Sequence, residues 1–144
     1  MTTAKRILNV TRASTAHETS MRVMVLSRDR RFRELAFLLL ERRGCSVTLG
    51  EGGGTLTERI NRDRTEVVII DADQSLAAAA RMSAAVEALG RPVGIVVVGN
   101  EASNELLKLQ AVTKWGSFDR LFEAVKQSYD ERGHRPLLFE QAAR

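Results

Sequence analysis

The residue best placed to do chemistry is Asp71, which directly follows an unbroken run of four β-branched apolar residues, Val67 to Ile70. Such a run is typical of a strand buried on both faces, as in the middle of a parallel sheet. Open α/β sheets gather their ligands and reacting groups at the carboxyl ends of the strands. The sequence therefore predicts that Asp71 lies at a functional edge of a sheet.

Other polar features have plainer interpretations. The segment Gly52-Gly53-Gly54-Thr55 lies between a predicted strand and a predicted helix, but it lacks the glycine spacing of phosphate-binding motifs. We interpret it as a connector, and we interpret Asp73 as a loop acid. His17 and His134 lie in the predicted tails, and no His, Cys or carboxylate cluster has zinc spacing. No catalytic triad or metal centre is expected, and we predict that the protein is not an enzyme.

Strands and helices alternate around Asp71. The predicted strands cover 22–26, 46–49, 67–70, 93–98 and 109–113. A polar loop is expected over 27–31, and Gly44 is expected to end the helix that begins at Phe32. Further helices are predicted from Thr55, where Glu58 completes a capping box, from Ser75 to Leu89, over a short piece at 103–107, and over 117–131.

This alternation predicts a flavodoxin-like (βα)5 three-layer sandwich with a shortened fourth helix. The parallel five-stranded sheet is expected in the order 2-1-3-4-5, whose switch point lies between strands 1 and 3. Asp71 would then sit beside the loop that begins at Ser27.

The length of 144 residues fits one domain, which we place at 21–131, between a disordered N-terminal tail at 1–20 and a C-terminal tail at 132–144. No apolar run is long enough for a membrane span, and the start of the chain lacks the apolar block of a secretory signal. The single cysteine, Cys45, is interpreted as a small buried hydrophobe. Its lack of a disulfide partner fits a reducing cytoplasm.

The formal charge is +4, the pI is about 9.8, and 18 of the 22 basic residues are arginine. This excess permits contact with acidic partners. Only seven residues are aromatic, too few for a surface on which single-stranded bases stack. We interpret the arginines as a solvated surface and do not expect nucleic-acid binding.

Five segments together resemble a response-regulator receiver domain of the CheY type. The resemblance covers about residues 21–131, and it rests on Arg33-Glu34-Leu35, Leu39 to Gly44, Val67 to Asp71, Thr113-Lys114 and Phe118 to Leu121. It implies that Asp71 stands where the family accepts a phosphoryl group from a histidine kinase. It also implies that Lys114 stands where the family contacts that phosphate. In the family, Mg²⁺ held by an acidic pair and the acceptor Asp neutralises charge during the transfer.

The sequence departs from the family at most of the remaining pocket positions. The acidic pair is replaced by Ser27 and Arg28, with Asp29 one position beyond, and the hydroxyl position falls at Val98 and Gly99. No metal site is therefore expected, and Mg²⁺ would be a cofactor only if Asp29 and Asp71 cooperated.

Two further positions differ from the family. Trp115 replaces the usual proline after the lysine, so no cis peptide is expected there, and Ala111 falls where an aromatic switch residue is common.

We consider two arrangements around the acceptor carboxylate. In the first, Arg28 or Lys114 permanently neutralises Asp71. In the second, Arg28 points into solvent and Asp71 pairs with Lys114 alone.

The resemblance leads to an atypical receiver that acts in signal transduction as a phosphorylation-independent protein-interaction module. Trp115, Phe118 and Phe122 are the candidate partner surface, and the expected partners are proteins such as a histidine kinase or an output protein. A homodimer is kept as an alternative.

Two other functions stay open. One is a phospho-accepting receiver of a two-component system, with Asp71 as the acceptor. The other is a localisation domain, because degenerate receivers of this kind resemble the N-terminal domains of TadZ/CpaE pilus-assembly proteins.

Overall fold

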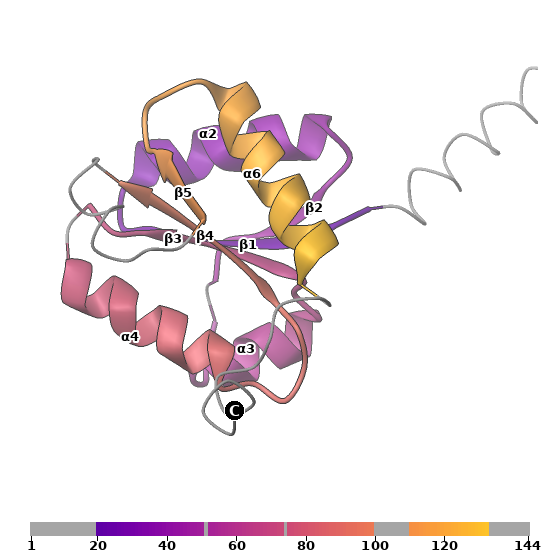
Figure 1. Ribbon diagram of the computed structural model, residues 1–144, viewed down its shortest axis with the longest axis vertical. Coiled ribbons are helices and arrows are strands. Elements are labelled where there is room, and N and C mark those ends of the chain that lie inside the picture. The colour runs from indigo at the N-terminus through magenta and orange to yellow at the C-terminus, as the bar shows by residue number, and fades with distance from the viewer. Residues whose placement is uncertain (1–19, 51, 74, 100–109, 133–144) are drawn as a thin grey trace, which may run out of the picture.

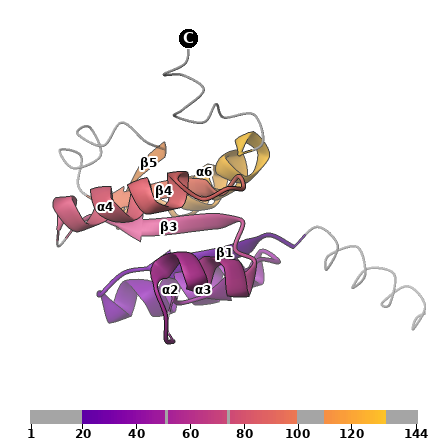
Figure 2. The same ribbon diagram turned by 90° about the horizontal axis from the view of Figure 1, so that it is seen from below.

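The computed structural model describes residues 20–50, 52–73, 75–99 and 110–132. Its five parallel strands form one sheet in the order β2-β1-β3-β4-β5, which confirms the predicted order. Figure 2, which views the domain from below, shows β3 between β1 and β4. The predicted helix at 103–107, nearly all of both predicted tails, and the two histidines lie outside the described residues.

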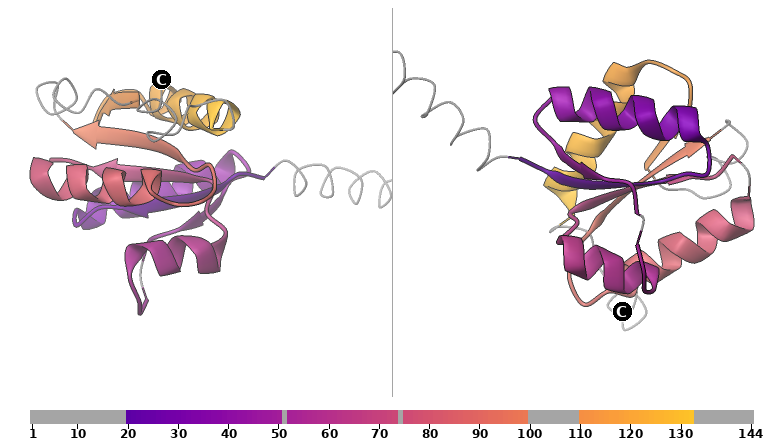
Figure 3. Two further views of the ribbon diagram at one scale, coloured as in Figure 1. Left: turned by 60° about the horizontal axis from the view of Figure 1, so that its bottom comes forward. Right: turned by 180° about the vertical axis from the view of Figure 1, so that it is seen from behind.

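The strands carry helices on both faces of the sheet (Figure 1). The strands are β1 (Arg22–Leu26), β2 (Ser46–Thr48), β3 (Val67–Asp71), β4 (Gly94–Gly99) and β5 (Gln110–Thr113). The helices are α2 (Arg30–Arg42), α3 (Leu56–Asp63), α4 (Leu76–Glu87) and α6 (Phe118–Glu131). Helices α2 and α6 cover one face, and α3 and α4 cover the other, as the view from behind in Figure 3 also shows.

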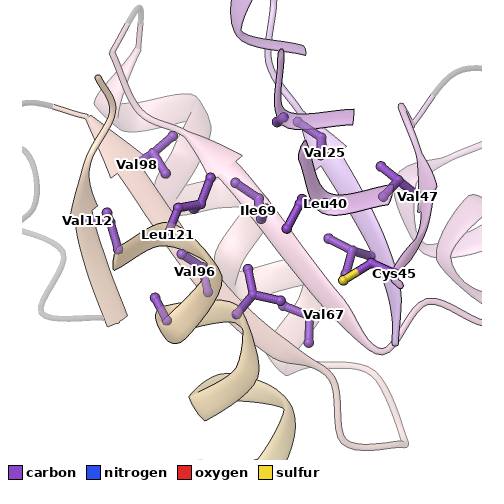
Figure 4. Packing of buried hydrophobic residues seen from close by; sticks show 14 of the residues in the cluster. Val25, Leu40, Cys45, Val47, Val67, Ile69, Val96, Val98, Val112 and Leu121 are labelled. Carbon is purple, nitrogen blue, oxygen red and sulfur yellow. The ribbon is translucent and has the colours of Figure 1, made fainter. Parts of the chain in front are cut away.

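The central strand β3 is buried on both faces, as its apolar run predicts. Val67 and Ile69 pack into the core under α2 and α6, which Figure 4 shows from close by. Val68 and Ile70 pack into the core under α3 and α4. All four side chains are fully buried, because alternate residues of a strand point to opposite faces. The carboxyl end of β3 is thereby held in the middle of the sheet.

The pairing between β3 and β4 sets the position of Asp71 along the sheet. Asp71 pairs with Val98, and Val67 at the other end of the strand pairs with Gly94. Helix α6 lies directly against Gly94, where an added Cβ would come within 2.8 Å of the Ser128 carbonyl oxygen. Ser128 Oγ in turn donates to the Ile95 carbonyl, so α6 is fixed closely onto β4.

Two predicted helix boundaries were wrong. The helix predicted to run to Leu89 ends at Glu87, and the first helix begins earlier than predicted. The loop expected over 27–31 ends two residues earlier, because α2 begins at Arg30 with Asp29 as its N-cap. The Asp29 side chain accepts a hydrogen bond from the Phe32 N–H at 3.2 Å, which satisfies one of the unpaired donors at the start of the helix. Gly44 follows the last turn of α2 with φ of +91°, as expected for a helix-ending glycine.

The two other predicted caps are present. Thr55 Oγ1 accepts from the Glu58 N–H, while the Thr55 N–H donates to the Glu58 carboxylate, so the capping box is complete. Ser75 caps α4 by accepting from the Ala78 N–H. Cys45 is buried as predicted, and burial raises the pKa of its thiol to about 11. None of the described helices has the length and apolar character needed to cross a membrane.

Candidate functional site

Three parallel strands bring the polar residues of the site to one edge of the sheet. Ser27 and Asp29 follow β1, Asp71 ends β3, Asp73 lies just beyond it, and Lys114 follows β5. The Lys114 N–H donates to the Gly99 carbonyl at 3.2 Å, so the lysine backbone continues the β4–β5 ladder. The Lys114 side chain can therefore reach across the strand ends toward β3.

The Lys114 ammonium lies among three carboxylates. Its Nζ is 2.9 Å from an oxygen of Asp71 and 2.9 Å from an oxygen of Asp29. A third carboxylate, that of Asp73, lies at 3.5 Å. The Lys114 side chain is 5% exposed and that of Asp71 is 3% exposed, so this pair is buried. We call these four residues the Lys114 cluster.

Asp71 has further hydrogen bonds on both of its carboxylate oxygens. Ser27 Oγ donates to Oδ2 at 2.6 Å, and the Asp73 N–H donates to Oδ1 at 2.9 Å. The same Ser27 oxygen accepts from the Asp29 N–H at 3.0 Å. Asp71 is thus held by the ends of three strands and is fully engaged within the protein.

The contacts of the cluster shift the pKa of two of its groups. Burial alone would lower the pKa of Lys114, but its hydrogen bonds to Asp71 and Asp29 outweigh that effect and hold the pKa above its ordinary value of 10.5. The pKa of Asp29 is lowered, chiefly by the hydrogen bond from Lys114 and next by that from the Phe32 N–H. Lys114 therefore stays charged at neutral pH.

Two aromatic rings flank the lysine. Nζ lies 5.6 Å from the centre of the Phe32 ring and 5.7 Å from that of Trp115, and the two rings meet edge to face. Such distances allow cation–π attraction. Phe32 is buried, whereas Trp115 is 56% exposed. The aromatic pair therefore links the buried charges to the surface.

The Mg²⁺ site that the resemblance implies does not fit these residues. Mg²⁺ takes about six hard oxygen ligands in near-octahedral geometry. Asp29 and Asp71 do cooperate, but they do so by sharing the Lys114 ammonium, which stands between them where a cation would have to bind. No group of three or more His, Cys, Asp or Glu side chains in the described ranges is arranged to hold a metal ion.

The structure places the other predicted site residues as follows. Val98 and Gly99 end β4 and offer no hydroxyl, whereas Ser27, from the opposite side of β3, supplies one to Asp71. Lys114 is the ion-pair partner of Asp71. Arg28 is exposed and makes no ion pair with any described residue, so the arrangement in which it neutralises Asp71 is not found.

The three residues of the predicted partner surface differ in their exposure. Trp115 is exposed, but Phe118 and Phe122 are partly buried against the core, with the Arg43 guanidinium over both rings. Three large apolar side chains of α2 are exposed and were missed by the prediction, namely Leu35 at 45%, Phe37 at 39% and Leu38 at 48%. Their signal was present in the sequence, because the apolar residues of α2 cover more of its circumference than one buried stripe requires.

Comparisons with known proteins add the fold family. No family model matches the sequence, and no curated protein matches it either. Several solved structures do. The first is the signal receiver domain of a putative LuxO repressor protein from Vibrio parahaemolyticus, with a TM-score of 0.60 and 15% identity over 79% of this chain and 93% of that one.

The second is a response regulator from Thermotoga maritima, with a TM-score of 0.57 and 18% identity over 77% of this chain and 98% of that one. The third is a response regulator receiver domain protein from Bacillus halodurans, with a TM-score of 0.52 and 15% identity over 76% and 97%. The chain has the CheY-like fold of response-regulator receiver domains.

Proposed function

We propose that this receiver-fold domain is an atypical response-regulator receiver, which acts in signal transduction mainly by binding a protein partner and does not require phosphorylation. The observation that carries the proposal is the Lys114 cluster. Lys114 already neutralises Asp71, at 2.9 Å, in a buried and hydrogen-bonded arrangement. In a phosphorylated receiver, a metal ion balances the negative charge of the acceptor site. In this chain, Lys114 already balances the charge of Asp71.

Phosphoryl transfer to Asp71 would meet two obstacles. The transferred group needs its charge neutralised by bound metal ions that bridge its oxygens, and an ammonium neutralises charge without bridging. The attacking carboxylate must also give up its present contacts, in which Oδ2 accepts from Ser27 and Lys114 and Oδ1 accepts from the Asp73 N–H. Both features favour a fixed ion pair over an acceptor.

A surface for a partner lies next to this ion pair. Leu35, Leu39 and Trp115 line one small hollow between α2 and the β5–α6 loop, and Lys114 forms part of its wall. Exposed apolar residues that cluster in this way mark sites of protein contact. A histidine kinase or an output protein fits this proposal. The localisation role seen in TadZ/CpaE-like domains stays a prediction, and so do the homodimer and a cytoplasmic location.

Phosphorylation can be tested by intact mass. The protein is incubated with Mg²⁺ and acetyl phosphate, in parallel with an Asp71→Ala variant and a control receiver known to be labelled. We expect no phosphoryl adduct on the wild-type chain. An adduct that needs Mg²⁺ and is absent from Asp71→Ala would contradict the proposal.

That contrary outcome would support the second candidate, a phospho-accepting receiver. The observation in its favour is that Asp29 and Asp73 lie close to Asp71, so displacement of Lys114 would leave three carboxylates together. Its most direct test is the Lys114→Met variant under the same labelling conditions. Labelling that appears only in this variant would show that the lysine blocks an otherwise competent site.

The surface can be tested by affinity capture from the source cell. A Leu35→Glu/Trp115→Glu double variant should lose a partner that the wild-type chain retains. The matched control is Arg120→Glu, which places a carboxylate on an exposed position of α6. Equal capture by all three proteins would place the partner surface elsewhere.

A further inference from the structure

A second cavity opens beside the Lys114 cluster, at the carboxyl ends of β1 and β3. Its volume is about 660 Å³. Four arginines from four different segments line it, and they are Arg28 after β1, Arg33 on α2, Arg59 on α3 and Arg81 on α4. Asp71 is the one acidic residue among the described lining residues. We call this space the arginine cavity.

The positive charge of the arginine cavity is not balanced by nearby carboxylates. None of its four arginines forms an ion pair within the described part of the chain, although arginines elsewhere do, such as Arg43 with Asp119. Asp71 offers little compensation, because its carboxylate is already paired with Lys114. Four guanidinium groups around one space repel each other, so the space favours an anion.

Two of these arginines hold buried donors that lack partners. The Nε atoms of Arg33 and Arg59 are buried and meet no hydrogen-bond acceptor in the described residues. A buried donor on a charged group that stays unpaired costs more than a neutral one, so such groups normally have a partner. Arg59 uses another nitrogen, Nη1, to donate to the Gly54 carbonyl at 2.7 Å, which fixes its position at the wall.

Another part of the wall of the arginine cavity is apolar. Leu26, Leu49 and Met82 line the same cavity. Gly50 lies among them, and an added Cβ there would come within 2.4 Å of Leu26 Cδ2, so the wall has no room for a larger residue at this point. The cavity therefore offers charged groups for an anion and an apolar surface for a flat or apolar moiety.

We propose that the arginine cavity binds a nucleotide with at least two phosphate groups. One guanidinium group can donate two parallel hydrogen bonds to the oxygens of one phosphate. Four arginines therefore supply enough donors for two phosphates. A cavity of about 660 Å³ lies within the usual range of small-molecule sites, roughly 300 to 1,000 Å³, and exceeds what one phosphate needs. The apolar wall is suited to the base. This site binds without Mg²⁺, because the arginines supply the positive charge.

The experiment is isothermal titration calorimetry of the full chain with ADP and GDP, without divalent cations. Inorganic phosphate and pyrophosphate are titrated separately to distinguish a nucleotide from a bare anion. Saturable binding of one nucleotide is expected, tighter than that of pyrophosphate. Arg33→Gln and Arg59→Gln should each weaken it about tenfold, the loss expected for one charge-assisted contact.

Arg120→Gln is the matched control, because it removes the same charge from an exposed position on α6 and should leave nucleotide affinity unchanged within about twofold. If circular dichroism shows that a variant at 33 or 59 is unfolded, Arg81→Gln decides, since Arg81 is exposed on α4. The proposal is overturned if neither nucleotide binds, if pyrophosphate binds as tightly as ADP and GDP, or if Arg120→Gln loses as much affinity as the cavity variants. None of these outcomes bears on whether Asp71 is phosphorylated.

Discussion

At one edge of the sheet, the Lys114 cluster and the arginine cavity contain opposite imbalances of charge. In the cluster, one ammonium is surrounded by three carboxylates at 2.9 to 3.5 Å. In the cavity, four guanidinium groups face one carboxylate that is already engaged. Asp71 belongs to both regions, so the two imbalances lie side by side.

The difference between the regions lies in how their charges are satisfied. Lys114 and Asp71 are almost wholly buried, and each finds its partners within the protein, so the cluster acts as a structural element of the sheet edge. The four arginines line an open cavity and form no ion pair with a described residue, and the Nε atoms of Arg33 and Arg59 are buried without an acceptor. Removing one partner of a buried pair leaves an uncompensated charge in the protein, whereas unpaired charges on an open cavity are available to a ligand. Perturbing each region separately should give distinct results.

The largest expected effect is that of removing the cation of the cluster. Lys114→Met leaves Asp71 buried without its charged partner, and breaking such a pair costs about 3 to 5 kcal/mol of folding free energy. Urea denaturation measures the change. Lys126→Met, at an exposed position of α6, should change stability by less than about 0.5 kcal/mol. If both variants are equally stable, the cluster is not structural.

Removing the charge of Asp71 should lower the free energy of unfolding more than removing that of Asp73. Asp71→Asn should cost about 2 kcal/mol, because a 3% exposed carboxylate with three hydrogen-bonding partners loses its ion pair. Asp73→Asn should cost less than about 0.5 kcal/mol, because its side chain is 36% exposed and more distant from Nζ. The order of the two losses, measured by thermal and urea unfolding, is the test. A larger loss at Asp73 would reverse the assignment of the buried pair.

The dependence of folding stability on pH, measured at acid pH, should show the contribution of the Asp29 carboxylate. Its pKa in the folded protein lies below the ordinary value of 3.8, so its carboxylate stabilises the fold above about pH 4, and this contribution disappears as the pH falls through the lowered value. The stability difference between wild type and Asp29→Asn should therefore shrink between about pH 5 and pH 3. Asparagine also caps helices well, so α2 keeps its N-cap in this variant. Asp130→Asn, at an exposed position, is the control, and a difference that does not vary with pH would argue against the shift.

The smallest effect belongs to the arginine cavity. Arg81→Gln should leave the free energy of unfolding within about 0.5 kcal/mol of wild type, and any change should be toward greater stability at low salt, because one of four like charges is removed. Urea unfolding at two salt concentrations measures this. A loss of more than about 1 kcal/mol would mean that Arg81 is held by the protein itself, as Lys114 is.

The sequence predicted the parts of this edge that depend on local pattern. The apolar run before Asp71 indicated β3, and alternation with helices indicated the order of the strands. The role of Asp29 as the N-cap of α2 was not predicted, because Asp29 was considered only in relation to the acidic pair of the receiver family. An Asp followed three residues later by the first apolar residue of a helix is itself a capping signal, and it would have moved the start of α2 to Arg30.

The arginine cavity could not be predicted in this way. Its arginines at 28, 33, 59 and 81 have no fixed spacing, and each belongs to a different segment. Only the packing of α3 and α4 beside the carboxyl ends of β1 and β3 brings them together. The same limit applies to Arg28, whose place in the chain suggested a partner for Asp71 but whose side chain is exposed.

The pairing of β3 with β4 has a consequence for how the chain avoids misfolding. Both strands are apolar along almost their whole length, so sliding one past the other would exchange one β-branched residue for another and lose little hydrophobic burial. Such a slip would move Asp71 by about 3.3 Å per residue and separate it from Lys114, leaving a buried carboxylate without its charged partner. The ion pair therefore selects the alignment Asp71 with Val98 from alignments that hydrophobicity alone cannot distinguish.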